Sequence, residues 1–238
     1  MANLPKVCIV VPLYNETRAV PELIRSLSGL KGDFDAVLVD ASDNENAKTA
    51  LGLAVASFRE PAGIRIVHSD VRGRAVQMNM GAASSDGELI LFLHCDTRLP
   101  PDAVELIRDA VNNGRQWGRF DVDLESEGVI YRIMEFMLRI RSRVRRLATG
   151  DQAMFVSRTL FDGVGGFPDI PLMEDIAVCK LLNESGPPAL VTTAVVTSGR
   201  RWENAGVLKT ILLMWKLRFL YWVGMDPAKL AAMYSDER

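Results

Sequence analysis

The apolar run at residues 89–93 ends abruptly at the polar residues His94, Cys95 and Asp96. A short uninterrupted apolar run of this kind is typical of a parallel strand buried on both faces of a sheet. Side chains alternate along a strand, so His94 and Asp96 are expected to point to one side. Ligands bind outside the carboxyl ends of parallel strands, where a carboxylate can hold a divalent cation against a phosphate. Asp96 is therefore a candidate metal or ligand-binding residue, and a cap on the following helix is the alternative.

Three further runs precede this one, two of them wholly apolar and the third interrupted by Arg65, and segments of helical periodicity separate them. The runs are residues 7–11, 36–39 and 64–67, with a helix expected over about 73–84. Such alternation is typical of βαβ units with right-handed crossovers, which build a parallel sheet. Polar residues follow each run: Tyr14, Asn15, Glu16, Asp40, Asp43, His68, Asp70, His94 and Asp96. Because these strand ends would meet at one edge, we expect a binding site there.

Composition and absent motifs narrow the class of protein. The 238 residues are 48% hydrophobic with a net charge of -2, which fits one large globular domain and argues against nucleic-acid binding. No dinucleotide-binding glycine fingerprint and no P-loop follow the first strand. Three scattered cysteines, the lack of a signal-peptide pattern and the lack of a bilayer-length apolar run predict a cytoplasmic protein. Association with a membrane surface is left open.

A segment with acids at alternate positions opens the second half of the chain. Residues 118–125 alternate apolar and acidic side chains, which predicts a half-exposed strand of a mixed sheet. On that interpretation Asp121 and Asp123 lie on the solvent face rather than bind a ligand.

Residues 129–147 combine a helical apolar seam with many arginines. The seam is Ile130, Ile133, Met137, Ile140, Val144 and Leu147, and Arg132, Arg139, Arg143 and Arg146 fall roughly opposite. Such a helix can pack on the domain, or on a second subunit in a homodimer, with its arginines in water. It can equally lie on an anionic membrane surface.

Two charged clusters elsewhere are candidates for function. Arg72 and Arg74 stand at the start of a predicted helix, where free N–H groups and guanidinium forks both suit phosphate, although solvated surface arginines are the alternative. Glu174 and Asp175 fall in the first turn of a helix over 172–182, where carboxylates also serve as simple caps.

Five short motifs follow one another along the chain: Val10-Val-Pro-Leu-Tyr-Asn-Glu16, Leu38-Val-Asp-Ala-Ser-Asp43, Asn79-Met-Gly-Ala82, Leu91-Phe-Leu-His-Cys-Asp96, and Gly165-Gly-Phe167 followed by Glu174-Asp175. Their order resembles that of family 2 glycosyltransferases of the GT-A fold. The resemblance implies an α/β fold with a mostly parallel central sheet flanked by helices and a mixed-sheet acceptor half. His94 stands where the family usually has the first Asp of its D-x-D motif, so this chain is similar to a subset with His-x-Asp-Thr. A hydrogen bond to a sugar or phosphate, metal ligation and packing all remain open for His94.

The resemblance implies an inverting transfer of a sugar from a UDP- or GDP-sugar to an acceptor hydroxyl. Asp96 would hold a divalent cation, Mg or Mn, on the diphosphate, and Asp175 would be the general base with Glu174 beside it. Nucleotide-sugar contacts are expected from Pro12, Tyr14, Asn15, Glu16, Asp40, Arg72, Arg74, His94, Arg200, Arg201 and Trp202. Asn79 is expected to fix the loop beneath the sugar. Lipid-linked acceptors are one option among several.

The chain is expected to divide into a GT-A glycosyltransferase domain at 1–205 and a C-terminal amphipathic helix within 206–238 that packs on the domain or at a membrane surface. Two other functions stay open at this point. One is a nucleotide-sugar-binding protein without catalysis, and the other is a peripheral membrane scaffold that uses the arginine-rich helix.

Overall fold

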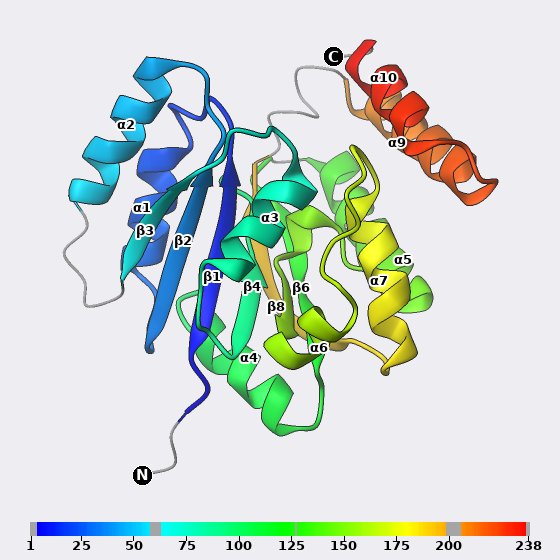
Figure 1. Cartoon of the computed structure of the whole chain (residues 1–238). Helices are drawn as coiled ribbons and strands as arrows, with labels where there is room; N and C mark the ends of the chain where they lie inside the picture. The colour runs from blue at the N-terminus through cyan, green and yellow to red at the C-terminus, as the bar shows by residue number, and fades with distance from the viewer. Residues whose placement is uncertain (1–3, 58–62, 127, 199–205, 237–238) are drawn as a thin grey trace.

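The computed structural model describes residues 4–57, 63–126, 128–198 and 206–236 (Figure 1). One eight-stranded sheet has the order β3-β2-β1-β4-β7-β6-β8-β5, and helices cover both of its faces. The strands are β1 Val7–Leu13, β2 Phe34–Asp40, β3 Ile64–His68, β4 Leu89–Phe92, β5 Thr97–Arg98, β6 Trp117–Leu124, β7 Met154–Ser157 and β8 Ala189–Thr197. The helices are α1 Val20–Ser28, α2 Glu45–Ala56, α3 Arg74–Ala83, α4 Ala103–Asn112, α5 Val129–Arg145, α6 Arg158–Gly163, α7 Glu174–Glu184, α9 Val207–Trp222 and α10 Pro227–Asp236, with a short 3-10 turn η1 at Gly150–Gln152.

The first half of the sheet is parallel, as its apolar runs predict. β1 lies between β2 and β4, and β3 follows β2 at the edge. Alternate residues of β1 enter two cores: Ile9 packs with α1, α2 and α4 on one face, and Val10 packs with α3, α6 and α7 on the other. This two-sided burial is why the strand is a continuous apolar run rather than an alternating one.

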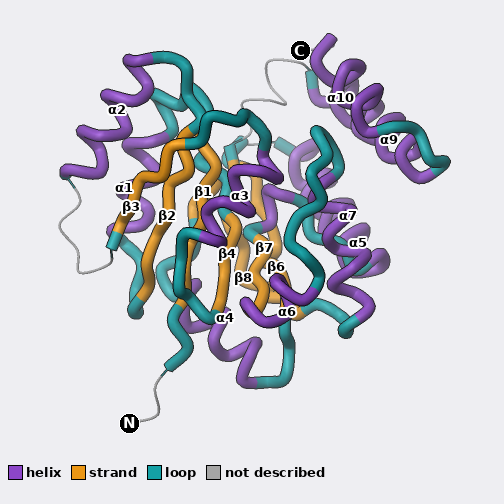
Figure 2. The backbone as a smooth tube through the Cα atoms, viewed as in Figure 1, coloured by secondary structure: helices purple, strands orange, loops and turns teal. Residues whose placement is uncertain are grey.

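The second half of the sheet is mixed, as expected, and its strands β7, β6 and β8 continue the sheet beyond β4 (Figure 2). β7 is antiparallel to β4 and to β6, whereas β8 is parallel to β6 and antiparallel to β5. The molecule therefore has an α/β GT-A-like architecture. The parallel strand ends of the first half face the loops of the second, and this juxtaposition creates the site.

The C-terminal segment forms two helices, α9 and α10, rather than the single helix expected from the sequence. Leu217 of α9 and Leu230 of α10 are fully buried in a small core with Leu172 and Met173 of the segment before α7. The pair is thereby packed on the domain, while a domain boundary at 205 stays a prediction. No helix in the described part of the chain is both long and apolar enough to cross a membrane.

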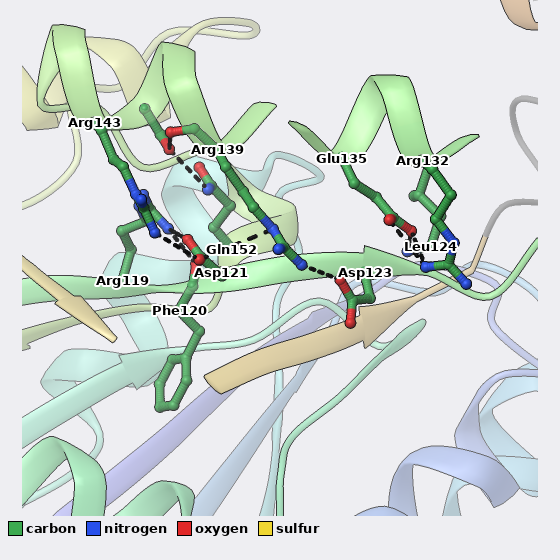
Figure 3. Close-up of polar contacts among 11 residues, drawn as sticks. Arg119, Phe120, Asp121, Asp123, Leu124, Arg132, Glu135, Arg139, Arg143 and Gln152 are labelled. Atoms are coloured by element: carbon green, nitrogen blue, oxygen red, sulfur yellow. Dashed lines mark hydrogen bonds and ion pairs between the residues drawn. The ribbon is translucent and has the colours of Figure 1, made fainter. Parts of the chain in front are cut away.

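Strand β6 corrects the prediction of a half-exposed strand. All but one of its residues are buried, and Asp121 is only 2% exposed, so the placement of Asp121 on the solvent face was wrong. Its carboxylate forms ion pairs with Arg119, which has no exposed surface, and with Arg143, at 3.1 Å between Nη2 and Oδ2 (Figure 3). The alternation of acids and apolar residues in β6 thus reflects a buried charge cluster under α5. Asp123 is more accessible and pairs with Arg139.

Helix α5 packs on the sheet through the face opposite to the one that its amphipathic pattern predicts. Its arginines reach the sheet, where Arg139 and Arg143 bind the acids of β6, while Arg132 binds the buried Glu135 within the helix (Figure 3). The seam residues Ile130, Ile133, Met137, Ile140 and Val144 are exposed instead. The helical periodicity alone could not reveal this orientation. The buried Asp121 carboxylate on β6 binds arginines, so the arginine face of α5 rather than its apolar face is stabilised against the sheet.

Candidate active site

The loop after β1 and the loop after β2 are hydrogen-bonded to each other, and together they carry the first group of predicted residues. Asn15 has a left-handed backbone with φ 55°, which asparagine tolerates, and its side-chain amide donates to Asp43 at 2.7 Å. The Tyr14 hydroxyl donates to the same carboxylate at 3.0 Å. The Arg72 guanidinium lies 4.0 Å from the centre of the Tyr14 ring, which links this loop to the start of α3.

Asp40 closes strand β2 with one carboxylate oxygen unused. Its Oδ1 accepts a hydrogen bond from the Ser42 backbone N–H at 3.0 Å, whereas its buried Oδ2 accepts none within the described residues. The Nδ1 atom of the exposed His68 ring lies 3.8 Å from Oδ2, beyond hydrogen-bond length. A buried acceptor without a donor is costly, so Oδ2 is suited to a ligand N–H or O–H group.

A groove of about 520 Å³ runs along this edge of the sheet. Among the residues that line it are Pro12, Tyr14, Glu16, Arg72, Arg74 and His94. Asn15 and Asp40 do not line the groove, and Asn15 instead braces the loop beside it. Arg200, Arg201 and Trp202 lie outside the described residues.

A second, smaller cavity of about 130 Å³ continues from the groove and contains the acidic residues of both halves. Asp96 from the loop after β4 and the pair Glu174 and Asp175 from α7 all line it. Arg74, His94 and Asp96 line both spaces, so they stand at the junction of the groove and the cavity. Residues almost 80 positions apart in the chain are thus brought to one site.

The start of α7 aims its acids into this cavity through an unusual backbone. Met173 precedes the helix in the left-handed conformation, with φ 71°, which costs energy in a residue other than glycine and turns the chain into the cavity. The Asp175 carboxylate accepts from the Gly150 backbone N–H at 3.3 Å and from the Ile176 N–H at 2.7 Å. Glu174 is 3% exposed and lies 3.6 Å from Arg74, measured between Oε1 and Nη1. Burial, with the Asp175 charge as a second cause, raises the pKa of Glu174, and Arg74 only partly opposes this shift.

The raised pKa gives a test of Glu174 by stability. The folded protein holds the Glu174 proton more tightly than the unfolded chain, so stability is lost as pH rises above the ordinary value of 4.5. We expect Glu174→Gln to gain stability relative to the wild type between pH 4 and pH 7.5 in urea unfolding. Glu184→Gln, at the exposed end of the same helix, is the control and should show no such trend. A pH-independent difference for Glu174→Gln would contradict the assigned environment.

The Gly165-Gly166-Phe167 turn is fixed by Asn79 of α3. The Asn79 amide donates to the Phe167 carbonyl at 2.8 Å and accepts from the Phe167 N–H at 2.9 Å. Phe167 in turn packs edge-on against Phe92 of β4, with 4.8 Å between ring centres. The asparagine of the Asn-x-Gly motif therefore anchors the chain that leads to α7.

Removing this anchor should destabilise the fold. We expect Asn79→Ala to lower the free energy of unfolding by about 1–3 kcal/mol, because two backbone groups of Phe167 lose their partners. Asn113→Ala, at the exposed end of α4, is the matched control and should change stability by less than about 0.5 kcal/mol. Equal losses in the two variants, measured by urea unfolding, would show that the Asn79 contacts contribute nothing.

Sequence reasoning missed several residues of the cavity. Thr149, Gly150 and Asp151 form a turn beside Asp175, and Arg218 of α9 and Tyr234 of α10 also line the cavity. The Gly150 backbone lies so close to the His94 ring that a Cβ atom there would approach Cε1 and Nε2 to 2.3 Å. Two local signals marked this turn: the glycine before a short apolar strand, and the capping box formed by Thr149 and Gln152. In contrast, α9 and α10 reach the site through their packing on Leu172 and Met173.

A metal ion at this site would be held by Asp96 rather than by a cluster of protein ligands. Within the described residues, no group of three or more His, Cys, Asp or Glu side chains is arranged to hold an ion. The donor set at the junction is the Asp96 carboxylate with the His94 ring in the same cavity. This set fits Mg²⁺ or Mn²⁺, because such ions are commonly bound by one or two carboxylates together with substrate phosphates.

Comparison with known proteins agrees with this architecture. Residues 8–162 match Glycosyl transferase family 2. The undecaprenyl-phosphate 4-deoxy-4-formamido-L-arabinose transferase of Proteus mirabilis is 29% identical over 106 residues, which are 43% of this chain and 32% of that protein. The chain thus matches about a third of the length of this relative.

Two solved structures share the fold. The mannosyltransferase PcManGT from Pyrobaculum calidifontis, in complex with GDP-Man and Mn²⁺, has a TM-score of 0.65 and 18% identity, covering 99% of this chain and 70% of that one. S. aureus TarS in complex with UDP has a TM-score of 0.65 and 15% identity, covering 81% of this chain and 60% of that one. The family match extends across the parallel half of the sheet, the Asp96 loop and strand β7, which is more than half of the chain. The chain therefore belongs to glycosyltransferase family 2.

Proposed function

We propose that this protein transfers a sugar from a nucleotide-diphospho-sugar to an acceptor hydroxyl with inversion at the anomeric carbon. The observation that carries the proposal is the shared cavity: Asp96 and Asp175, from opposite halves of the sheet, line one space that opens into a groove of nucleotide size. Membership of family 2 supports it. The names of the relatives, which include a GDP-Man complex and an undecaprenyl-phosphate transferase, support a UDP- or GDP-sugar donor and a lipid-linked acceptor.

The donor would lie along the groove with its base toward the β1 and β2 ends. Tyr14 and Pro12 offer a flat, partly apolar wall for the base. The buried Oδ2 of Asp40, at the end of β2, has no hydrogen-bond partner within the described residues and would accept from the donor if the groove opened to it on binding. Arg72 and Arg74, at the start of α3, would hold the diphosphate, since forked guanidinium groups and free helix N–H groups both favour phosphate oxygens. Arg74 also touches Glu174, which would couple donor binding to the acidic pair.

Asp96 would hold a divalent cation against the diphosphate, with His94 beside it. When bound, that ion neutralises charge on the leaving group as a Lewis acid. The protein's own part is to place a carboxylate at the point where the groove meets the cavity.

Asp175 would be the general base. A bond forms between the anomeric carbon and the acceptor oxygen while the bond from that carbon to the diphosphate breaks. The hydroxyl proton passes to the Asp175 carboxylate, and the nucleoside diphosphate leaves. The Gly150 and Ile176 N–H groups hold the carboxylate toward the cavity, so it is oriented before the acceptor arrives.

The test is a donor screen followed by metal removal. Thermal shift with UDP-, GDP- and dTDP-sugars should identify the donor, and donor turnover should then be followed with Mg²⁺ or Mn²⁺. We expect EDTA to reduce turnover by at least about tenfold and added metal to restore it. Donor binding without any turnover would favour a nucleotide-sugar-binding protein, and turnover that ignores EDTA would contradict a metal role for Asp96.

Helix α5 remains a proposed contact with a membrane surface or with a second copy of the chain. The exposed seam residues Ile130, Ile133 and Ile140 would make that contact, since the arginines of α5 that bind β6 are turned away from it. Cytoplasmic location stays a prediction.

A further inference from the structure

An apolar groove separates helix α5 from helix α9. It has a volume of about 610 Å³. Each helix lines it with one stripe of side chains at helical spacing: Met134, Met137, Leu138, Arg141 and Arg145 from α5, and Ile211, Met214, Trp215, Arg218, Phe219 and Trp222 from α9. The two stripes come from two helices that lie far apart in the sequence.

The walls of this groove are large apolar side chains that remain accessible. Trp215, Phe219 and Trp222 are 53%, 59% and 75% exposed. Exposure of apolar surface to water is unfavourable in free energy, and contiguous exposed apolar patches mark binding sites. The shape is a channel between two helices, which suits a chain of methylene groups rather than a flat partner.

Arginines stand inside the groove without acidic partners at contact distance. Among the described residues, Arg141, Arg145 and Arg218 form no ion pair, unlike Arg139 and Arg143 on the other face of α5. The Arg141 Nε is buried and makes no hydrogen bond, and its Nη2 donates only to the Thr149 hydroxyl, at 3.3 Å. Burial lowers the pKa of Arg141 to about 10 and also lowers that of Arg218, because both guanidinium groups are partly desolvated.

The groove is continuous with the catalytic cavity. Leu138, Met214 and Arg218 line both spaces. Thr149, the hydrogen-bond partner of Arg141, also lines the cavity that contains Asp175. An amphiphile with its chain between α5 and α9 would therefore carry its head past the arginines and toward Asp175.

We propose that this groove binds the acceptor, a lipid whose head carries a phosphate next to the chain and a hydroxyl beyond it. The inference rests on the proposed transferase function and names its acceptor class. The chain lies between the two helices, the phosphate pairs with Arg141 and Arg218, and the hydroxyl reaches Asp175. Transfer then forms the bond from the anomeric carbon to the lipid hydroxyl oxygen, releases nucleoside diphosphate and passes the hydroxyl proton to Asp175.

The test uses alkyl phosphates as probes on the full chain, by calorimetry below their micellar concentrations. We expect decyl phosphate to bind at one site and far more tightly than inorganic phosphate or decanol. Decyl phosphate should also bind about tenfold more tightly than octyl phosphate, because two more methylene groups are buried. Arg141→Gln and Arg218→Gln should each weaken decyl phosphate binding by about tenfold or more, because each removes a charged hydrogen-bond donor.

Controls separate this proposal from the proposed function. Lys216→Gln, on α9 but outside the groove, should leave decyl phosphate affinity unchanged, and Trp215→Ser should abolish the gain from octyl to decyl phosphate. Nucleotide affinity should stay at the wild-type level in the arginine variants, because neither residue lines the donor groove. The proposed lipid site would be wrong if both arginine variants bound decyl phosphate with wild-type affinity. It would also be wrong if the wild-type protein turned over the donor but bound decyl phosphate no more tightly than inorganic phosphate. A chain that binds decyl phosphate but cleaves no donor would overturn the transferase function instead.

Discussion

Replacing Asp175 with Asn should reduce sugar transfer by about 10²–10⁴-fold while leaving donor affinity within a few-fold of the wild type. The amide cannot take a proton from the acceptor hydroxyl. Its single oxygen can keep one of the two hydrogen bonds that orient the carboxylate, which the Ile176 N–H donates to Oδ1 and the Gly150 N–H donates to Oδ2. Gly150, Ile176 and Asp175 do not line the donor groove, so the variant should keep its contacts with the nucleotide. The measurement is single-turnover transfer beside calorimetric titration of the donor.

The control for this variant is Asp151→Asn. Asp151 lines the same cavity, yet its carboxylate accepts a hydrogen bond from the Thr149 hydroxyl and is not assigned a proton-transfer role. We expect its rate to fall by less than about tenfold. If Asp175→Asn lost donor binding and thermal stability together with activity, the carboxylate would be a helix cap in the first turn of α7 rather than a base.

The parallel half of the sheet could be predicted from the sequence because each of its central strands is apolar on both faces. Strands β1, β2 and β4 are almost fully buried, so their sequences carry no competing polar pattern and stop sharply at the edge of the site. The convergence of Asp96 with Glu174 and Asp175 on one cavity came from the family resemblance, since spacing along the chain does not bring α7 to the end of β4.

The second half was harder to predict because its charges are internal. Amphipathic patterns assume that charged faces meet water, and β6 with α5 violates that assumption through a buried acid cluster. The same reversal exposes the apolar seam of α5 and opens the groove against α9. Residues such as Arg218 and Tyr234 enter the site by long-range packing, for which no local signal exists.

Replacing Asp121 with Asn should cost about 3–5 kcal/mol of unfolding free energy, the loss expected when one partner of a buried ion pair is removed. Arg119 has no exposed surface, and Asp121 carries the countercharge for it, with Arg143 at 3.1 Å and Arg139 at 3.9 Å from Oδ2. Arg139 and Arg143 can turn toward water, whereas Arg119 is held in the sheet. For a chain of this length the melting midpoint should fall by roughly 10 °C.

Asp123→Asn is the matched control on the same strand. Its side chain and that of its partner Arg139 are each 36% exposed, so solvent screens the pair and the loss should stay below about 1 kcal/mol. The double variant Asp121→Asn with Arg119→Met should recover part of the stability, because it removes the buried cation left without a countercharge. Similar losses for Asp121→Asn and Asp123→Asn, or no recovery in the double variant, would mean that β6 is held by its apolar neighbours and that the charge cluster does not orient α5.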